Sequence, residues 1–232
     1  MARYLIIAAS SAIGKSVALL LQQQGHEVLT TAQSTEKITP DFILDASDFD
    51  AVDKVFEQAG RIDGVVNCAG SLLLKSAHMT SLDELQKTIN ASLITSFATV
   101  RAAGKHMSNG GSVVLIASAA ALTGLANHEA IAAVKAGVIG LAKSAAATYA
   151  SSNLRINVVA PGMVRTPLTS GLLHNELVVK ALTAMHVLGR IGEPCDVAKA
   201  ILFFLNPENN WITGQVLAVD GGLSSVRPKL KV

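Results

Sequence analysis

The stretch YLIIAASSAIG, residues 4–14, decides the fold of this chain. Its first part, Tyr4 to Ala8, is the kind of short apolar run that is typical of a strand buried on both faces of a parallel sheet. Residues 11–24 then carry apolar side chains at helical spacing, and Gly25 follows as a signal for the end of a helix. The chain therefore opens with a strand that turns through small residues into an amphipathic helix.

The same alternation continues along the rest of the chain. We expect further strands at residues 27–30, 41–45, 62–66, 112–117, 154–159 and 215–219, and helices at 48–59, 81–107, 128–149 and 196–205. Any helix between the second and third strands is stunted, because only a short Ser/Thr/Lys segment joins them. This pattern predicts an α/β fold: a Rossmann-like doubly wound parallel sheet in three layers (α/β/α) with right-handed crossovers.

Nothing along the chain marks a second domain. We find no repeat, linker or low-complexity segment, so we expect a single domain over residues 1–232. Two segments fall outside the regular alternation. One is a loop-rich stretch at about 167–189, and the other is a short tail at 224–232 that is basic from Arg227 to Lys231.

The composition narrows the class of protein. Half of the 232 residues are apolar, which suits a large buried core, and a net charge of +2 is too small to indicate nucleic-acid binding. Cys68 and Cys195 form no CxxC motif and accompany no ligand-spaced histidines, so we expect no metal site. No apolar stretch reaches membrane-spanning length, and the apolar N-terminal run lacks a cleavage region. We therefore predict a cytoplasmic protein without a membrane partner.

Small and polar residues follow the predicted strands at one edge of the sheet, where doubly wound sheets bind their ligands. The first turn, residues 8–14, is made of small residues that let a pyrophosphate approach the N–H groups of a helix N-terminus, although Gly14 is its only glycine. Residues 67–70, Ser118 and residues 161–167 follow later strands. Because all of these lie at carboxyl ends, we expect them to form one site.

The order of these motifs resembles the short-chain dehydrogenase/reductase family over almost the whole chain, most closely its 3-oxoacyl-[acyl-carrier-protein] reductase branch. The matching segments are SSAIG at 10–14, LD at 44–45, NCAG at 67–70, IN at 89–90, Ser118, Lys135, RINVVAPG at 155–162, RIGEP at 190–194, and ITGQ with VDGG at 212–222. The resemblance implies an oxidoreductase that binds NAD(P)(H), acts on a small molecule and assembles as a homo-oligomer, either a tetramer or a dimer.

The resemblance also assigns roles along the edge. Ser10, Ser11, Ile13 and Gly14 contact the pyrophosphate, Asp45 the adenine, Asn67, Ala69 and Gly70 the adenosine side, Lys135 the nicotinamide ribose, and Pro161, Gly162, Val164 and Thr166 the nicotinamide. Two positions depart from the family, because Ala8 and Ala12 stand where it usually has glycine. The turn tolerates the added methyl groups if neither position requires a positive φ.

The loop after the second strand bears on the choice of coenzyme. A carboxylate there bonds the ribose 2′-OH and repels a 2′-phosphate, and this chain has no acid in the loop before Glu36. The hydroxyls and amide at 30–35, Ser34 among them, and the nearby Lys37 favour NADP(H), with NAD as the alternative. The other interpretation is a solvated loop that discriminates poorly.

One residue of the family's catalytic set is missing. In the family, a tyrosine phenol exchanges a proton with the substrate oxygen, a lysine four residues further on lowers the pKa of the phenol, a serine bonds the oxygen, and an asparagine positions the lysine. Ser118, Lys135 and Asn90 match three of these positions, but the tyrosine position holds Ile131. Neither tyrosine of the chain lies near enough in the predicted fold to replace it. The family mechanism therefore cannot run unchanged.

His128 is the candidate replacement for the missing acid. It precedes Lys135 by two helical turns, so the two side chains project alike from the predicted helix. Some enoyl reductases of the superfamily carry their tyrosine at this position, and a histidine there suits proton donation near neutral pH. The alternative is a surface histidine near the start of the helix, with no role.

Two functions are open from the sequence. The first is an NAD(P)(H)-dependent short-chain oxidoreductase that acts on a carbonyl, an alcohol or an activated double bond by hydride transfer. The second is a dinucleotide-binding pseudoenzyme that serves as a sensor or partner subunit. Both predict dinucleotide binding, and they differ in turnover.

Overall fold

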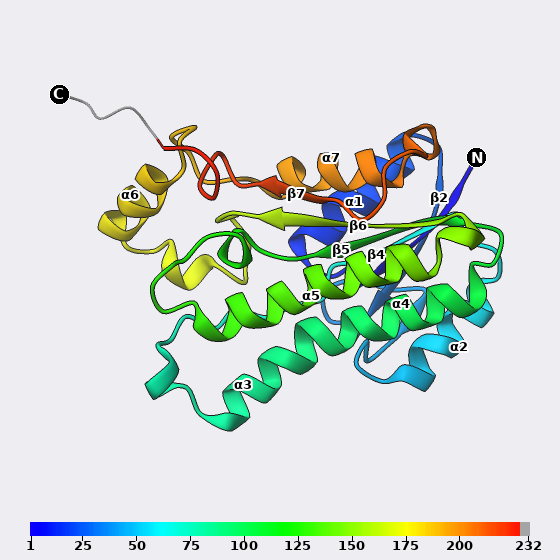
Figure 1. Ribbon diagram of the computed structural model, residues 1–232, viewed down its shortest axis with the longest axis horizontal. Coiled ribbons are helices and arrows are strands. Elements are labelled where there is room, and N and C mark those ends of the chain that lie inside the picture. Colours follow the sequence, from blue (N-terminus) through cyan, green and yellow to red (C-terminus); the bar gives the residue numbers. More distant parts are fainter. Residues whose placement is uncertain (228–232) are drawn as a thin grey trace.

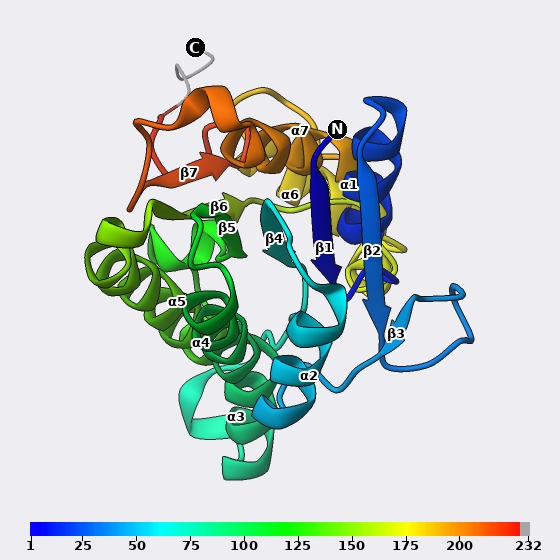
Figure 2. The same cartoon turned by 90° about the vertical axis from the view of Figure 1, so that its right-hand side faces the viewer.

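In the computed structural model, which describes residues 1–227, parallel strands form one sheet between two layers of helices (Figure 1, Figure 2). The strands are β1 Arg3–Ile7, β2 Glu27–Ala32, β3 Phe42–Ile43, β4 Gly64–Asn67, β5 Gly111–Ile116, β6 Leu154–Pro161 and β7 Val216–Val219. Their order is β3-β2-β1-β4-β5-β6-β7, and every pair is parallel. The Rossmann-like fold predicted from the sequence is confirmed. The tail beyond residue 227 lies outside the described residues.

The helices divide between the two faces of the sheet (Figure 2). One face is covered by α1 Ala12–Gln23 and α7 Pro194–Leu205, and the other by α2 Phe49–Ala59, α4 Thr95–His106 and α5 Glu129–Thr148. Two further helices extend from this body: α3 Leu82–Ile89 precedes α4, and α6 Glu176–Met185 lies beyond the tip of β6 (Figure 1). No helix joins β2 to β3, as the short polar connection predicts.

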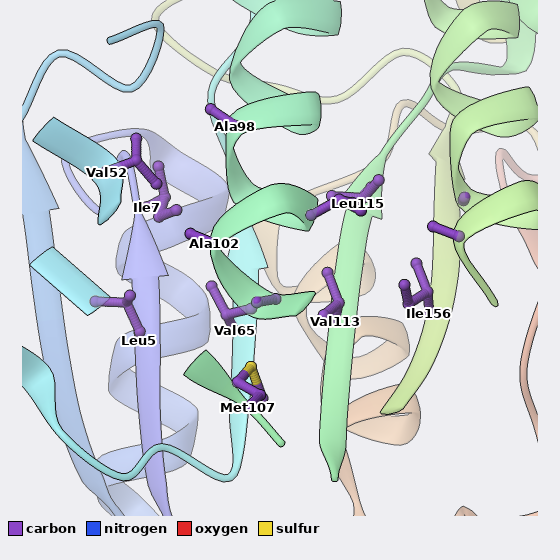
Figure 3. Packing of buried hydrophobic residues seen from close by; sticks show 14 of the residues in the cluster. Leu5, Ile7, Val52, Val65, Ala98, Ala102, Met107, Val113, Leu115 and Ile156 are labelled. Carbon is purple, nitrogen blue, oxygen red and sulfur yellow. The ribbon is translucent and has the colours of Figure 1, made fainter. Parts of the chain in front are cut away.

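The apolar strands are buried on both faces because they pack against both helical layers. Leu5 and Ile7 of β1 face the cluster that includes Ala98 and Ala102 of α4 (Figure 3). Tyr4 and Ile6, which alternate with them along the strand, belong to the second cluster with α1 and α7. This alternation of side chains fixes the register of β1 in the sheet.

Two segments differ from the sequence-based expectation. The predicted helix at 81–107 is interrupted by a turn of π-helix, Asn90–Ile94, where side-chain hydroxyls such as that of Ser96 bond backbone carbonyls one turn earlier. The loop-rich stretch contains α6, whose first amides are capped by the side chain of Asn175. Both features arise from local polar bonding that apolar periodicity does not report.

Helix α5 corrects a further expectation. By length and composition it is apolar enough to cross a membrane, so the statement that no stretch reaches this length is wrong. In the structure, α5 buries a row that includes Ile131, Lys135 and Val138, and it packs against β6 and α4. The apolar side chains of α5 are thus part of the hydrophobic core beside the sheet.

Candidate functional site

The predicted site residues lie at one edge of the sheet. Strand β1 is flanked by β2 on one side and β4 on the other, so the switch point of the sheet lies between the carboxyl ends of β1 and β4. The segments at 8–14, 67–70, 118 and 161–167 all follow strands at this edge. The structure therefore brings together the turns that the sequence placed there.

The turn after β1 presents unpaired backbone donors. Ser11 is the N-cap of α1, and its Oγ accepts from the Gly14 amide at 3.0 Å. The amides of Ala12 and Ile13 donate to no acceptor within residues 1–227. A Cβ on Gly14 would lie 2.8 Å from the Ala8 carbonyl oxygen, so only glycine lets the helix approach the strand this closely. Such a helix start suits a pyrophosphate.

Ala8 carries backbone strain in this turn. Its φ is +58°, in the left-handed region, whereas Ala12 begins α1 with helical geometry. The condition under which the turn tolerates both alanines without strain, a negative φ at each, therefore holds at Ala12 and fails at Ala8. The left-handed region costs an L-residue about 1–2 kcal/mol, which explains why the family usually has glycine at this position.

Replacing Ala8 by glycine should stabilise the fold. We expect Ala8→Gly to raise the free energy of unfolding by about 0.5–1 kcal/mol, because relief of the left-handed strain exceeds the added entropy of the unfolded chain. Urea unfolding measures the change, and Ala12→Gly is the matched control, expected to be neutral or destabilising. If the Ala8→Gly protein proves no more stable than the Ala12→Gly protein, Ala8 is not strained in the folded chain.

The segment after β4 is shaped by the side chain of Asn67. Its Nδ2 donates to Thr99 Oγ1 at 2.9 Å and its Oδ1 accepts from the Ala69 amide at 2.8 Å, so both of its groups are used within the protein. Burial raises the pKa of the neighbouring Cys68 thiol to about 12, so the thiol remains neutral.

Lys135 lies at the centre of the edge and is 5% exposed. Its Nζ donates to the Ile116 carbonyl at 2.8 Å, and burial lowers the pKa of its ammonium group to about 8. Ser118 lies two residues beyond Ile116, where its Oγ accepts from the Ala120 amide at 3.1 Å. Ile131, one turn before Lys135 on α5, is buried and carries no polar atom.

The side chain of Asn90, which the resemblance assigns to positioning Lys135, lies away from the core, whereas that of Ser92 is buried. The Asn90 side chain is exposed, and its Oδ1 accepts from Gln86 Nε2 at 2.8 Å. Ser92, in the same π-turn, is fully buried, and its Oγ has no hydrogen-bond partner within residues 1–227. A Cβ built on Gly70 would lie 3.8 Å from this oxygen and 3.4 Å from Lys135 Nζ. Ser92 is therefore a buried polar residue on the same side of Gly70 as Lys135, and no motif in the sequence pointed to it.

His128 lies just before α5 and has a non-helical backbone, with φ −113° and ψ 12°. The ring is half-buried, and its Nδ1 lies 2.7 Å from the Ala126 carbonyl oxygen, so Nδ1 is the donor. The Nε2 atom has no partner within the described residues. The direction of this ring is therefore set by its bond to the Ala126 carbonyl and not by the helical spacing to Lys135.

The segment after β6 contains one amide that stays unpaired. The amides of Gly162 and Arg165 bond the carbonyls of Val219 and Gly192, and the Met163 amide donates to the ring of His186 at 3.1 Å. The Val164 amide has no acceptor within residues 1–227, although Val164 is buried. An unpaired buried donor is unfavourable unless a ligand bonds it. His186 is a second buried polar residue that the sequence analysis missed.

The loop between β2 and β3 provides exposed polar and basic groups. Ser34 is exposed, and Lys15 of α1 reaches the loop, with its Nζ 3.4 Å from the Lys37 carbonyl oxygen. Hydrogen bonds from the amide and hydroxyl of Ser47 lower the pKa of Asp45, whose second carboxylate oxygen has no bond within the described residues. The loop and its neighbour Lys15 thus offer a hydroxyl and a cation, and Asp45 after β3 offers a free carboxylate oxygen.

Other features of the molecule do not compete with this edge. A cavity of about 420 Å³ lies at the opposite ends of the strands between Arg61, His106 and Gly110, and none of the predicted site residues lines it. Within residues 1–227, no three His, Cys, Asp or Glu side chains gather as metal ligands. Cys68 and Cys195 are both free thiols.

Comparisons with known proteins agree with this geometry. The family model described as "Enoyl-(Acyl carrier protein) reductase" matches residues 7–224. Carbonyl reductase family member 4 of Danio rerio is 37% identical, and the 3-oxoacyl-[acyl-carrier-protein] reductase of Thermotoga maritima is 35% identical, each over 94% of this chain and 96% of its own length.

Solved structures share the whole fold. ElxO with NADP bound has a TM-score of 0.89 at 32% identity, covering 97% of this chain and 100% of ElxO. Thermoplasma acidophilum aldohexose dehydrogenase in ligand-free form has a TM-score of 0.89 at 29% identity, covering 100% and 97%. The chain therefore belongs to the short-chain dehydrogenase/reductase family of oxidoreductases.

Proposed function

We propose that this protein is an NADP(H)-dependent oxidoreductase that interconverts a carbonyl and an alcohol, or reduces an activated double bond, on a small molecule. The observation that carries the proposal is a row of backbone donors without acceptors at one edge of the sheet. The Ala12 and Ile13 amides lie at its start and the Val164 amide at its end, with Lys135 between them in the sheet order. This spacing along the edge suits an extended dinucleotide.

The residues present fit the coenzyme. The first turn of α1, with Ser10, Ser11, Ile13 and Gly14, would hold the pyrophosphate, and Asp45 with residues 67–70 the adenosine. Lys135 would bond the nicotinamide ribose, and the segment Pro161, Gly162, Val164 and Thr166 would hold the nicotinamide through its unpaired amide. The glycine that permits the close approach at the pyrophosphate is Gly14.

The 2′-phosphate of NADP(H) suits the loop after β2. No carboxylate directly follows this strand, and Ser34 with the ammonium of Lys15 offers bonds that the phosphate can use. The structures of ElxO with NADP or NADPH bound support this choice by similarity. We expect NADPH to bind more tightly than NADH.

Four residues of the chain would contribute to the reaction. When bound, the nicotinamide supplies or accepts the hydride. Ser118 would hold the substrate oxygen, and the cation of Lys135 would orient the coenzyme and favour negative charge nearby. Ile131 cannot exchange a proton, so the protonation step falls to another group, for which His128 with its free Nε2 is the candidate. Asn90 would act through its backbone in the π-turn, because its side chain is exposed.

Turnover with a panel of ketones and enoyl thioesters in the presence of NADPH tests the proposal. We expect measurable turnover, and we expect His128→Asn to lower kcat by about 100-fold, because asparagine retains a donor for the Ala126 carbonyl but has no titratable proton. Unchanged turnover in His128→Asn would remove His128 from the reaction. NADPH binding without turnover on any substrate would instead favour the sensor or partner-subunit role.

The surface supports a homo-oligomer as part of the proposal. Phe97 of α4 and Leu217 of β7 are large exposed apolar side chains on regular elements, and Trp211 is 96% exposed. Apolar surface of this kind is typical of subunit contacts. We propose a dimer or tetramer, located in the cytoplasm.

A further inference from the structure

His186 stands out as a buried histidine with both ring nitrogens bonded. It is 3% exposed, its Nδ1 lies 2.7 Å from the Leu182 carbonyl oxygen, and its Nε2 lies 3.1 Å from the Met163 amide nitrogen. A carbonyl oxygen only accepts and an amide N–H only donates. The two partners therefore require a neutral ring with its proton on Nδ1.

The ring is packed tightly between the ends of two strands. A Cβ on Gly162, after β6, would lie 2.8 Å from His186 Nε2, and a Cβ on Gly221, after β7, would lie 3.4 Å from His186 Cβ. The next residues continue this contact, because the Leu188 amide donates to the Gly221 carbonyl at 3.0 Å. The glycines leave the space that the imidazole occupies.

The charged neighbour of this ring is Asp220, which lies against Gly162 at the same junction. Its carboxylate accepts hydrogen bonds from the Gly222 amide and from the amide and hydroxyl of Ser224. Asp220 is thus bonded within its own turn, and the bond from Met163 remains the polar link between His186 and the strand ends.

This link also reaches helix α6. None of the α6 residues Glu176–Met185 is buried, whereas His186, which follows directly, is. The Nδ1 bond to Leu182 ties the ring to the last turn of α6, and the Nε2 bond ties it to Met163. His186 therefore joins a helix that has no buried side chain of its own to the edge of the sheet.

We propose that His186 is a positioning residue that fixes the backbone at Met163 so that the next amide, that of Val164, is presented to the coenzyme, and that anchors α6 over the same end of the site. This inference rests on the proposed function for its coenzyme half. The mechanism is direct: the bond to the Met163 amide fixes one peptide, and the amide that follows is the unpaired one.

Three substitutions separate the two bonds. The amide oxygen of glutamine can take the place of Nε2 and accept from Met163, whereas asparagine can donate to Leu182 but does not reach Met163. Alanine makes neither bond. His174→Gln, at an exposed position in the same stretch, is the matched control. Each protein is titrated with NADPH by fluorescence, and the rate of protease cleavage within 165–189 is measured without coenzyme.

We expect His186→Asn and His186→Ala to raise the Kd for NADPH about tenfold and to speed cleavage several-fold, and His186→Gln to stay within about threefold of wild type in both. Wild-type values for all three variants would overturn the inference, and so would a glutamine variant as impaired as alanine while still folded. If the wild-type protein itself fails to bind NADPH, the proposed function and the coenzyme half of the inference fall together, while the cleavage rates still decide whether His186 anchors α6.

Discussion

Ile131→Tyr should raise the rate of NADPH-dependent ketone reduction by 100-fold or more over the wild-type protein. The substitution places a phenol four residues before Lys135 on α5, and the ammonium of Lys135 bonds the carbonyl of Ile116, two residues before Ser118. A positioned general acid contributes about 10²- to 10⁴-fold to such a step, and the ammonium of Lys135 would lower the pKa of the phenol. Initial rates with a panel of ketones measure the change.

The matched control for this prediction is Ile131→Phe, which adds an aromatic ring of similar size at a buried position without the hydroxyl. If phenylalanine raises the rate as much as tyrosine does, packing rather than proton transfer explains the gain. No gain with tyrosine in a protein that still folds and binds NADPH would show that Ser118 and Lys135 are not arranged for this chemistry.

Lys135→Met should make the protein more stable and impair coenzyme binding. Burial lowers the pKa of Lys135 from 10.5 to about 8, so holding its charge in the folded protein is unfavourable at neutral pH. We expect methionine to raise the free energy of unfolding by about 2 kcal/mol at pH 7, after the loss of the bond to Ile116, and to raise the Kd for NADPH about tenfold or more.

The pH dependence identifies the origin of this effect. The lowered pKa means that between about pH 8 and 10.5 the unfolded chain binds a proton that the folded chain has released, so wild-type stability rises through this window. The stability advantage of Lys135→Met is therefore complete below pH 8 and disappears toward pH 10.5. Lys143→Met, at an exposed position on the same helix, should show neither change. An advantage that does not vary with pH would contradict burial of the charge as its cause.

The sequence predicts the fold well because apolar runs and helical stripes report burial directly. The strand at 4–8 and the helix at 11–24 are close to β1 and α1, and the carboxyl-end turns meet where the strand order places them. Periodicity does not report hydrogen bonds between side chains and backbone. The π-turn at Asn90–Ile94 and the cap of α6 by Asn175 were therefore missed.

The site was predicted in outline and less well in detail. Lys135 is buried at the strand edge, but Asn90 is exposed, and the buried hydroxyl of the same π-turn is that of Ser92. His186 was missed because a histidine in a loop-rich stretch gives no signal of burial until β6 and β7 are placed around it. The positive φ of Ala8 was also invisible, since it depends on the geometry of the turn rather than on the residue type.

Titration of the purified protein with NADPH and NADH, followed by coenzyme fluorescence, tests the central claim most directly. If the unpaired amides of the α1 turn and of Val164 hold a nicotinamide dinucleotide, NADPH binds saturably at one site per chain and more tightly than NADH. Absence of saturable binding of either coenzyme to the folded protein would contradict the account.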